Sequence, residues 1–187
     1  MKNPFLIGTN VYLRPLERED AAQIVAWLND PEITHSLTLY RPLSRRAEED
    51  YLDKLAASEP EIGLGIAVRE TDRLIGVTGL KDLDVKNRSA CFGIVIGEKA
   101  EWDKGHGTEA TALMVRYAFE TLNLNRVWLH VLEYNQRGVR AYEKVGFRKE
   151  GVLRQEHYRH GRYWDTITMA ILRADWDALQ PPRSATV

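Results

Sequence analysis

Residues 135–147 read Asn-Gln-Arg-Gly-Val-Arg-Ala-Tyr-Glu-Lys-Val-Gly-Phe. The short apolar run just before them, residues 127–132, is suited to a buried central strand. The stretch itself predicts a helix over residues 136–145, because Gly146 is the residue type that ends a helix in the left-handed conformation. The sequence therefore predicts a buried strand followed directly by a helix in this part of the chain.

A second marked stretch, residues 102–110, reads Trp-Asp-Lys-Gly-His-Gly-Thr-Glu-Ala and lies between an apolar run and an amphipathic helix. Two glycines one residue apart let the backbone come close to a ligand. The unpaired N–H groups of a helix start then form a site for a pyrophosphate. An ordinary turn explains the glycines equally well. The stretch is neither a Walker loop nor a dinucleotide fingerprint, because the Gly-Lys-Ser/Thr ending and the third glycine are missing.

Working outward, the chain alternates further strands and helices without an internal repeat. We expect Asp20 and Ser44 to cap two early helices, and His160 or Gly161 to take positive φ in a late hairpin turn. Strands are expected at residues 11–14, 65–69, 74–80, 88–96 and 127–132 and on both sides of the turn at 159–162. This order predicts the α+β class: a mixed sheet of about seven strands with helices on both faces. Residues 1–180 are expected to form one domain, and residues 181–187 a disordered tail.

The composition is that of an ordinary globular domain, with 187 residues, 44% of them hydrophobic and 28% charged. The net charge of −1 gives no general attraction for nucleic acid or an anionic membrane, so neither is expected as a partner. The single cysteine, Cys91, excludes an internal disulfide and a cysteine-based metal site, and no metal is expected. No apolar run approaches the length of a membrane span, and we expect a cytoplasmic protein.

Taken together, the two stretches resemble the GNAT acetyltransferase superfamily. The glycine loop looks like its pyrophosphate-binding motif, and the run from Asn135 through Tyr142, Lys144 and Gly146 to Phe147 looks like its second cofactor motif. Residues 12–16 and 161–165 look like the branch of ribosomal-protein (RimJ/RimL-like) and spermidine N-acetyltransferases. The resemblance implies the GNAT fold, acetyl-CoA as the cofactor, and acetyl transfer to a primary amine of a small molecule or a protein N-terminus.

The resemblance also implies roles for individual residues of the cofactor site. The backbone of one strand would meet the pantetheine arm, the glycine loop the pyrophosphate, and an asparagine side chain the pantetheine amide. Two arginines are candidates for the 3′-phosphate, although both would also suit a solvated helix surface. In that order, the residues are Ile94, Val95 and Ile96; Lys104, Gly105, His106, Gly107 and Thr108; Asn135; and Arg137 and Arg140. Trp102 is a departure, because many members have Gln or Arg there, and it puts a side-chain phosphate contact in doubt.

For catalysis, the resemblance places Tyr142 beside the thioester sulfur, where its hydroxyl would act as general acid. The alternative is a core tyrosine with a hydrogen-bonded hydroxyl. The general base is left open between His130, Glu133, Glu98 and a chain of waters. Strand alternation puts Glu133 on the face opposite His130 unless a bulge intervenes.

The loop at residues 30–44 is expected to form the acceptor pocket, with His35, Tyr40 and Arg41 as candidates. Spermidine acetyltransferases carry acidic residues just before the proline that corresponds to Pro42, whereas Arg41 precedes it here. A cation there disfavours a polyamine and would suit a carboxylate; an exposed loop arginine is the alternative. Two other functions stay open: a non-catalytic acyl-CoA sensor or interaction module, and a phosphate-binding protein that uses the glycine loop alone. Bare sheet edges invite pairing, so a homodimer through the C-terminal strands is one of the assemblies left open.

Overall fold

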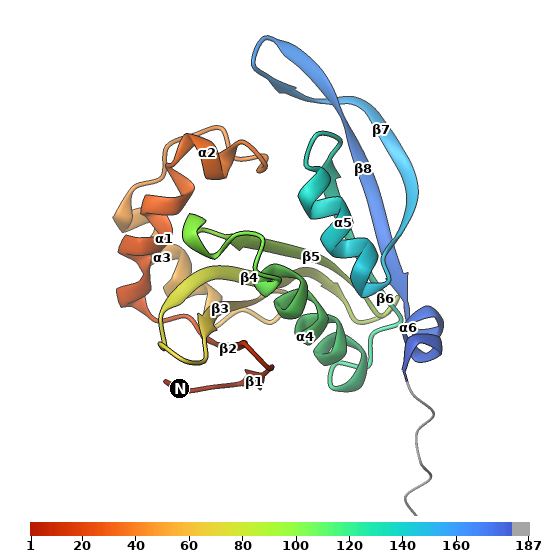
Figure 1. The fold of residues 1–187 in the computed structure, drawn as a ribbon, viewed down its shortest axis with the longest axis horizontal. Helices are drawn as coiled ribbons and strands as arrows, with labels where there is room; N and C mark the ends of the chain where they lie inside the picture. Colours follow the sequence, from red (N-terminus) through yellow and green to blue (C-terminus); the bar gives the residue numbers. More distant parts are fainter. Residues whose placement is uncertain (181–187) are drawn as a thin grey trace, which may run out of the picture.

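A computed structural model describes residues 1–180; the tail expected at residues 181–187 lies outside them. One mixed sheet of eight strands, in the order β1-β2-β3-β4-β5-β6-β8-β7, runs through the molecule (Figure 1). Helices cover both of its faces, so the predicted α+β class is confirmed. Within the described part of the chain, no helix is long and apolar enough to cross a membrane.

The strands are β1 (Leu6–Ile7), β2 (Val11–Pro15), β3 (Ile62–Val68), β4 (Leu74–Asp84), β5 (Ser89–Ile96), β6 (Arg126–Leu132), β7 (Arg148–Arg159) and β8 (Arg162–Leu172). The α-helices are α1 (Ala21–Leu28), α2 (Pro31–Thr34), α3 (Arg45–Leu55), α4 (His106–Glu120), α5 (Gln136–Val145) and α6 (Arg173–Leu179). Two 3₁₀ turns, η1 (Arg18–Asp20) and η2 (Lys99–Glu101), precede α1 and α4.

Three elements were not expected from the sequence: β1, α2 and α6. β1 has two residues, too few for a periodic pattern. α2 begins at Pro31, because proline is tolerated in the first turn of a helix, and the Asp30 side chain accepts the Glu32 N–H there at 2.8 Å. α6 has seven residues and buries Trp176.

The predicted helix ends are mostly confirmed. The Ser44 hydroxyl accepts the Ala47 N–H at 3.2 Å, and Gly146 ends α5 at φ 109°. His160 and Gly161 both take positive φ in the hairpin turn. The cap at Asp20 is wrong: its carboxylate makes two 2.8 Å bonds to Arg14 instead.

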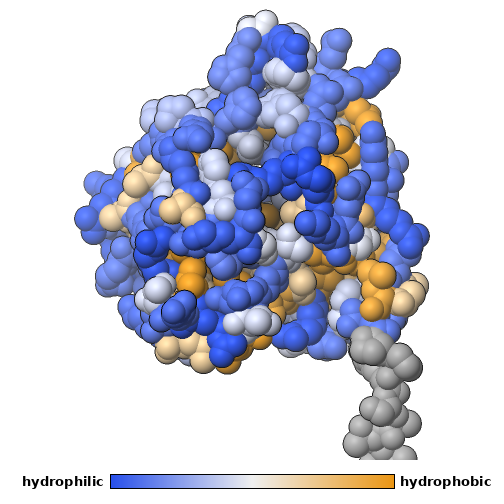
Figure 2. Space-filling view, viewed as in Figure 1, coloured by the Kyte–Doolittle hydropathy of each residue, from blue (hydrophilic) through white to orange (hydrophobic). Residues whose placement is uncertain are grey.

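The two faces of the sheet have separate cores. Under α4 and α5 lie buried residues such as Met114, Leu129 and Tyr142, and under α1–α3 lie Ile24 and Leu52. The outer surface in the same view is mostly hydrophilic, with apolar side chains in narrow strips (Figure 2). One face of the sheet is therefore covered by α4 and α5, and the other by α1–α3. The candidate site includes residues from both sides.

Candidate functional site

The sheet is split between its two central parallel strands. β5 and β6 pair only from Ser89 opposite Arg126 to Cys91 opposite Trp128, and beyond that point they diverge. β4 continues to pair with β5, and β8 with β6, so each side of the gap stays ordered. A cleft of about 740 Å³ occupies the gap, within the usual range for ligand pockets.

The free edge of β5 lines this gap with backbone groups. The N–H of Gly97 bonds to Ile75 of β4, and successive residues of a strand direct their backbone groups to opposite sides. The backbone of Val95 therefore faces β4, while that of Ile94 and Ile96 faces the cleft. The Ile96 carbonyl accepts the Trp102 indole N–H at 2.8 Å, so Ile94 is the best placed of the three predicted residues to meet a ligand amide.

The start of α4 presents unpaired N–H groups to the same cleft. Gly105 has φ 85°, a conformation that favours glycine, and leads into a helix of 15 residues. The first N–H that bonds within the helix is that of Glu109, to Gly105 at 3.0 Å. The N–H groups of His106, Gly107 and Thr108 precede it, and Gly105 supplies no side-chain cap. This helix start fits an anionic group such as a pyrophosphate.

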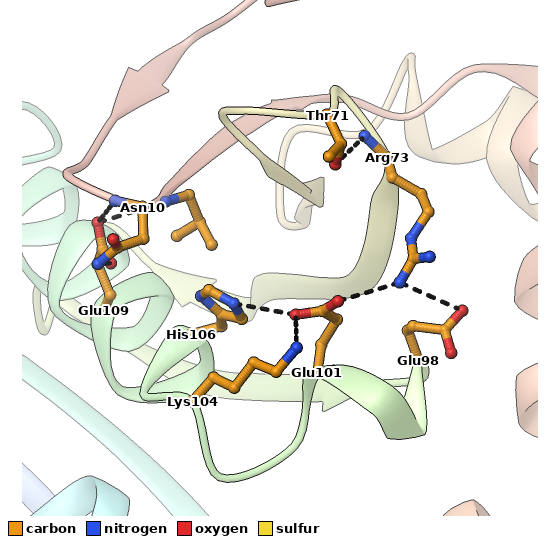
Figure 3. Close-up of polar contacts among 9 residues, drawn as sticks. Asn10, Thr71, Arg73, Glu98, Glu101, Lys104, His106 and Glu109 are labelled. Carbon is orange, nitrogen blue, oxygen red and sulfur yellow. Dashed lines mark hydrogen bonds and ion pairs between the residues drawn. The ribbon is translucent and has the colours of Figure 1, made fainter.

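The side chains of the glycine loop are engaged elsewhere. Glu101 accepts Lys104 at 3.1 Å, His106 at 3.2 Å and Arg73 at 3.1 Å (Figure 3). The hydrogen bond from Lys104 is the main cause of the lowered pKa of Glu101. Lys104 and His106 thus hold the loop in place through Glu101, and their backbones are left for a ligand. Glu98, one of the predicted bases, lies 3.9 Å from Arg73 and does not line the cleft.

The start of α5 closes the cleft opposite α4. The Asn135 side chain accepts the Gly138 N–H at 2.9 Å as a helix cap, and it lines the cleft. The Arg137 guanidinium stacks 4.0 Å from the centre of the Trp102 ring. Where many family members have Gln or Arg, Trp102 thus provides an aromatic ring on which the Arg137 guanidinium stacks. Arg140 also lines the cleft, as does Lys144, a residue of the second motif to which the sequence assigned no role.

Tyr142 lies on the inner face of α5, 9% exposed, and lines the cleft. Its ring meets Phe92 edge to face at 6.2 Å. Burial raises the pKa of Tyr142 to about 12, so the hydroxyl keeps its proton at neutral pH. Among residues 1–180, no hydrogen-bond partner for this hydroxyl is found, which differs from a core tyrosine with a satisfied hydroxyl.

The remaining predicted bases are placed differently. His130 is exposed on β6, lines the cleft and contacts the Trp128 ring at 5.2 Å. Glu133 accepts the Asp165 N–H at 3.0 Å and helps to join β6 to β8. Of the three, only His130 faces the cleft.

Two carboxylates from the α1–α3 face line the far end of the cleft, and sequence reasoning missed both. Glu48 is 5% exposed, with no side-chain partner among the described residues, and burial raises its pKa. Glu61 accepts the Tyr51 hydroxyl at 2.6 Å. Residue spacing could have identified Glu48. It lies on the same face of α3 as Tyr51, Leu52 and Leu55, where an apolar residue is expected.

The predicted acceptor residues do not line the cleft themselves. Tyr40 is 81% exposed, and Arg41 lies 5.2 Å from the Tyr40 ring centre. The ring of His35 contacts Tyr134, whose hydroxyl donates to the His35 carbonyl at 2.9 Å. The neighbouring Ser36, Leu37 and Thr38 do line the cleft.

A residue from the β7–β8 hairpin holds this acceptor loop. The Arg159 guanidinium donates to the carbonyl oxygens of Thr34 and Leu37, the latter at 2.7 Å. In Figure 1 the hairpin projects beyond the sheet. Since these residues are more than 120 positions apart in sequence, no local pattern announces the contact. Within the described chain, no group of three or more His, Cys, Asp or Glu is arranged to hold a metal ion.

Comparisons with known proteins agree with this geometry. Residues 10–148 match the family model described as Acetyltransferase (GNAT) domain. The chain is 33% identical to the uncharacterized N-acetyltransferase YoaA of Bacillus subtilis, over 91% of this chain and 97% of that protein. It is 30% identical to spermidine N(1)-acetyltransferase of Escherichia coli, over 88% and 87%. The crystal structure of spermidine N-acetyltransferase from Vibrio cholerae, in complex with CoA and spermine, aligns with a TM-score of 0.84 at 30% identity, covering 90% of this chain and 99% of that one.

The split sheet, the glycine-led helix start and the family match lead to one conclusion. The chain belongs to the GNAT family of acetyltransferases and is an acetyl-CoA-dependent N-acetyltransferase that transfers the acetyl group to an amine.

Proposed function

We propose that the acceptor is a small primary amine that carries at least one further positive charge. The observation that carries this proposal is Glu48, a buried carboxylate that lines the cleft without a partner in residues 1–180. A buried unpaired carboxylate is costly, and a ligand cation would offset that cost. Glu61 adds a second negative charge at this end of the cleft. The only ammonium group among the described residues that line this end is that of Lys81.

The geometry removes the argument against a polyamine. That argument rested on Arg41 beside Pro42, but Arg41 stacks on exposed Tyr40 and does not line the cleft. The relatives from E. coli and V. cholerae are named spermidine acetyltransferases, which supports the same acceptor class. Spermidine is therefore the first acceptor to test, and the ribosomal-protein branch is the alternative.

In the proposed arrangement, the N–H groups of His106, Gly107 and Thr108 hold the pyrophosphate. The Ile94 backbone and the Asn135 side-chain amide meet the pantetheine arm, and Arg137, Arg140 and Lys144 supply positive charge for the 3′-phosphate. Acetyl-CoA supplies an activated acyl carbon. The side-chain contacts already present among Glu101, Lys104 and His106 fix the loop before the ligand arrives, which reduces the entropy lost on binding.

Tyr142 is the proposed general acid. As the acceptor nitrogen bonds to the acyl carbon, the carbon–sulfur bond breaks and the Tyr142 hydroxyl donates its proton to the departing sulfur. The amine loses one proton to His130 or to water, and water returns a proton to Tyr142. Because its pKa is about 12, Tyr142 remains a proton donor across the physiological pH range.

The Tyr142→Phe variant tests both the enzyme and the acid. We expect kcat to fall about 100-fold or more, the size typical of a lost general acid, while acetyl-CoA affinity changes less than twofold. The assay is thiol release from acetyl-CoA with spermidine, amino acids, aminoglycosides and peptides. Tyr117→Phe, outside the cleft, is the matched control. Tight binding without turnover of any acceptor would favour the non-catalytic sensor instead.

We also propose a homodimer and a cytosolic location. β7 is the outermost strand of the sheet, and Val152 and Leu153 on it are each 40% exposed. An exposed edge strand invites pairing with a second copy. A Leu153→Lys variant should shift the mass measured by light scattering from dimer to monomer, and a wild-type monomer at micromolar concentration would refute the dimer. Cell fractionation tests the location.

A further inference from the structure

A buried hydroxyl on β8 has no partner. Thr166 is 2% exposed, and its Oγ1 has no hydrogen bond to any of residues 1–180. It nevertheless lines the cleft. An unsatisfied buried hydroxyl costs about 1–3 kcal/mol, so such a group needs an explanation. Of the four buried side-chain atoms without a partner in the described chain, it is the only oxygen, and a hydroxyl oxygen can accept an N–H donor.

The backbone holds this hydroxyl firmly in place. β8 lies between β6 and β7, and Thr166 pairs with Leu132 on one side and Leu153 on the other (Figure 1). The adjacent Asp165 N–H is held by Glu133 at 3.0 Å. Threonine is also stiff at χ1. Thr166 therefore has little freedom to swing toward another protein group.

The side chain of Thr166 lies on the face of the sheet opposite α4 and α5. Ile167, the next residue, packs against the core under α4 and α5, the cluster that contains Tyr142. Since side chains alternate along a strand, Thr166 points to the opposite face, as does Thr168. Thr168 pairs with His130, so His130 shares this face. Tyr142 and Thr166 thus border the cleft from opposite faces of the split sheet.

We propose that Thr166 is a substrate-binding residue of the acceptor subsite: its hydroxyl oxygen accepts a hydrogen bond from an N–H of the attacking amine. This inference rests on the proposed function only in requiring a primary amine. The bond holds the nitrogen on the face opposite Tyr142, with its lone pair free for the acyl carbon. Thr166 neither gains nor loses a proton in the reaction.

Two variants separate this role from a structural one. Thr166→Val keeps the shape and removes the hydroxyl, so we expect Tm to rise by about 2–4 °C as an unsatisfied group disappears. The same change should raise KM for the amine about 5- to 10-fold, with KM for acetyl-CoA unchanged. Thr166→Ser keeps the hydroxyl and loses a methyl group, so Tm should fall while KM for the amine stays within about twofold.

The probes are spermidine and triglycine, measured by turnover and by calorimetric binding in the presence of coenzyme A. Both amines should weaken alike in Thr166→Val, because the hydroxyl contacts the nitrogen they share. Glu48→Gln, in contrast, should weaken spermidine alone, so failure of the charged-acceptor proposal is distinguishable. Unchanged affinity for both amines in Thr166→Val, or a fall in its Tm, would overturn the assignment of Thr166.

Discussion

The two ends of the cleft are held together by different kinds of interaction. At the cofactor end, the functional groups are mainly backbone: the N–H groups at the start of α4 and the free edge of β5. At the proposed acceptor end they are side chains whose positions depend on contacts between separate elements, such as Tyr51 with Glu61 and Arg159 with the Thr34 carbonyl. A site made of backbone depends on local conformation, whereas a site made of side chains depends on packing. The two ends should therefore respond to mutation in different ways.

The largest effect in this comparison is expected from Gly105→Ala at the cofactor end. Gly105 has φ 85°, and an added Cβ would meet no atom within 4 Å, so the cost is one of backbone conformation alone. A left-handed conformation costs an L-residue about 1–2 kcal/mol, which predicts a 5- to 30-fold rise in KM for acetyl-CoA. Gly151→Ala, outside the cleft, is the control: its Cβ would also meet no atom within 4 Å, and Gly151 does not have positive φ. Equal effects of the two variants would contradict the backbone account.

A smaller effect, confined to the acceptor end, is expected from Arg159→Gln. The guanidinium fixes the carbonyls of Thr34 and Leu37 and thereby the loop that lines the cleft. Water can partly replace the guanidinium at these carbonyls. We therefore expect about a fivefold rise in KM for the amine, a smaller effect than the complete loss of a charged hydrogen bond would have. KM for acetyl-CoA should not change. Exposed Arg154 on the same strand gives the control, Arg154→Gln. A change in acetyl-CoA affinity with Arg159→Gln would show that the two ends are coupled.

The smallest effect is expected in stability, from Glu48→Gln. Burial raises the pKa of Glu48, so the folded state binds its proton more tightly than the unfolded state does. Stability is then lost as the pH rises from the ordinary value of 4.5 through the raised pKa. Glu48→Gln should remove that loss, with Tm about 2–4 °C above wild type at pH 8 and a difference that shrinks toward pH 4.5. Thermal unfolding at several pH values measures it; a constant difference would show that the charge is not responsible.

Much of the fold could be predicted from sequence because its signals are local. The helix at residues 136–145 matches α5, and its end at Gly146 follows from a residue type suited to positive φ. The missed elements have local reasons too: β1 is too short for a pattern, and Pro31 serves as a helix start as readily as a stop. Asp20 shows the limit, because an aspartate before a helix is a good cap until a buried arginine takes its carboxylate.

The residues of the candidate site also differ in whether a local sequence signal could predict them. Most residues expected at the cofactor end, including Asn135, Thr108 and Tyr142, line one cleft, whereas Lys104 does not line it and is bonded to Glu101. At the acceptor end, Tyr40 and Arg41 do not line it, and Glu48, Glu61 and Thr166 do. Glu98 and Glu133 were plausible bases until the structure showed them held by Arg73 and by the Asp165 N–H. The partners of Glu98 and Glu133 are distant in sequence, so no local pattern announces either contact.

The sequence by itself determined the family, the fold class and the cofactor end, because a glycine with positive φ, a helix start and a helix cap are written in a few consecutive residues. Only the tertiary structure decided which side chains line the proposed acceptor end of the cleft. Their positions depend on how far β5 and β6 diverge, on which face β8 turns Thr166 toward, and on where a hairpin residue reaches the loop after α2. Those features are set by strand register and by packing between distant segments, and a single sequence carries no local signal for either.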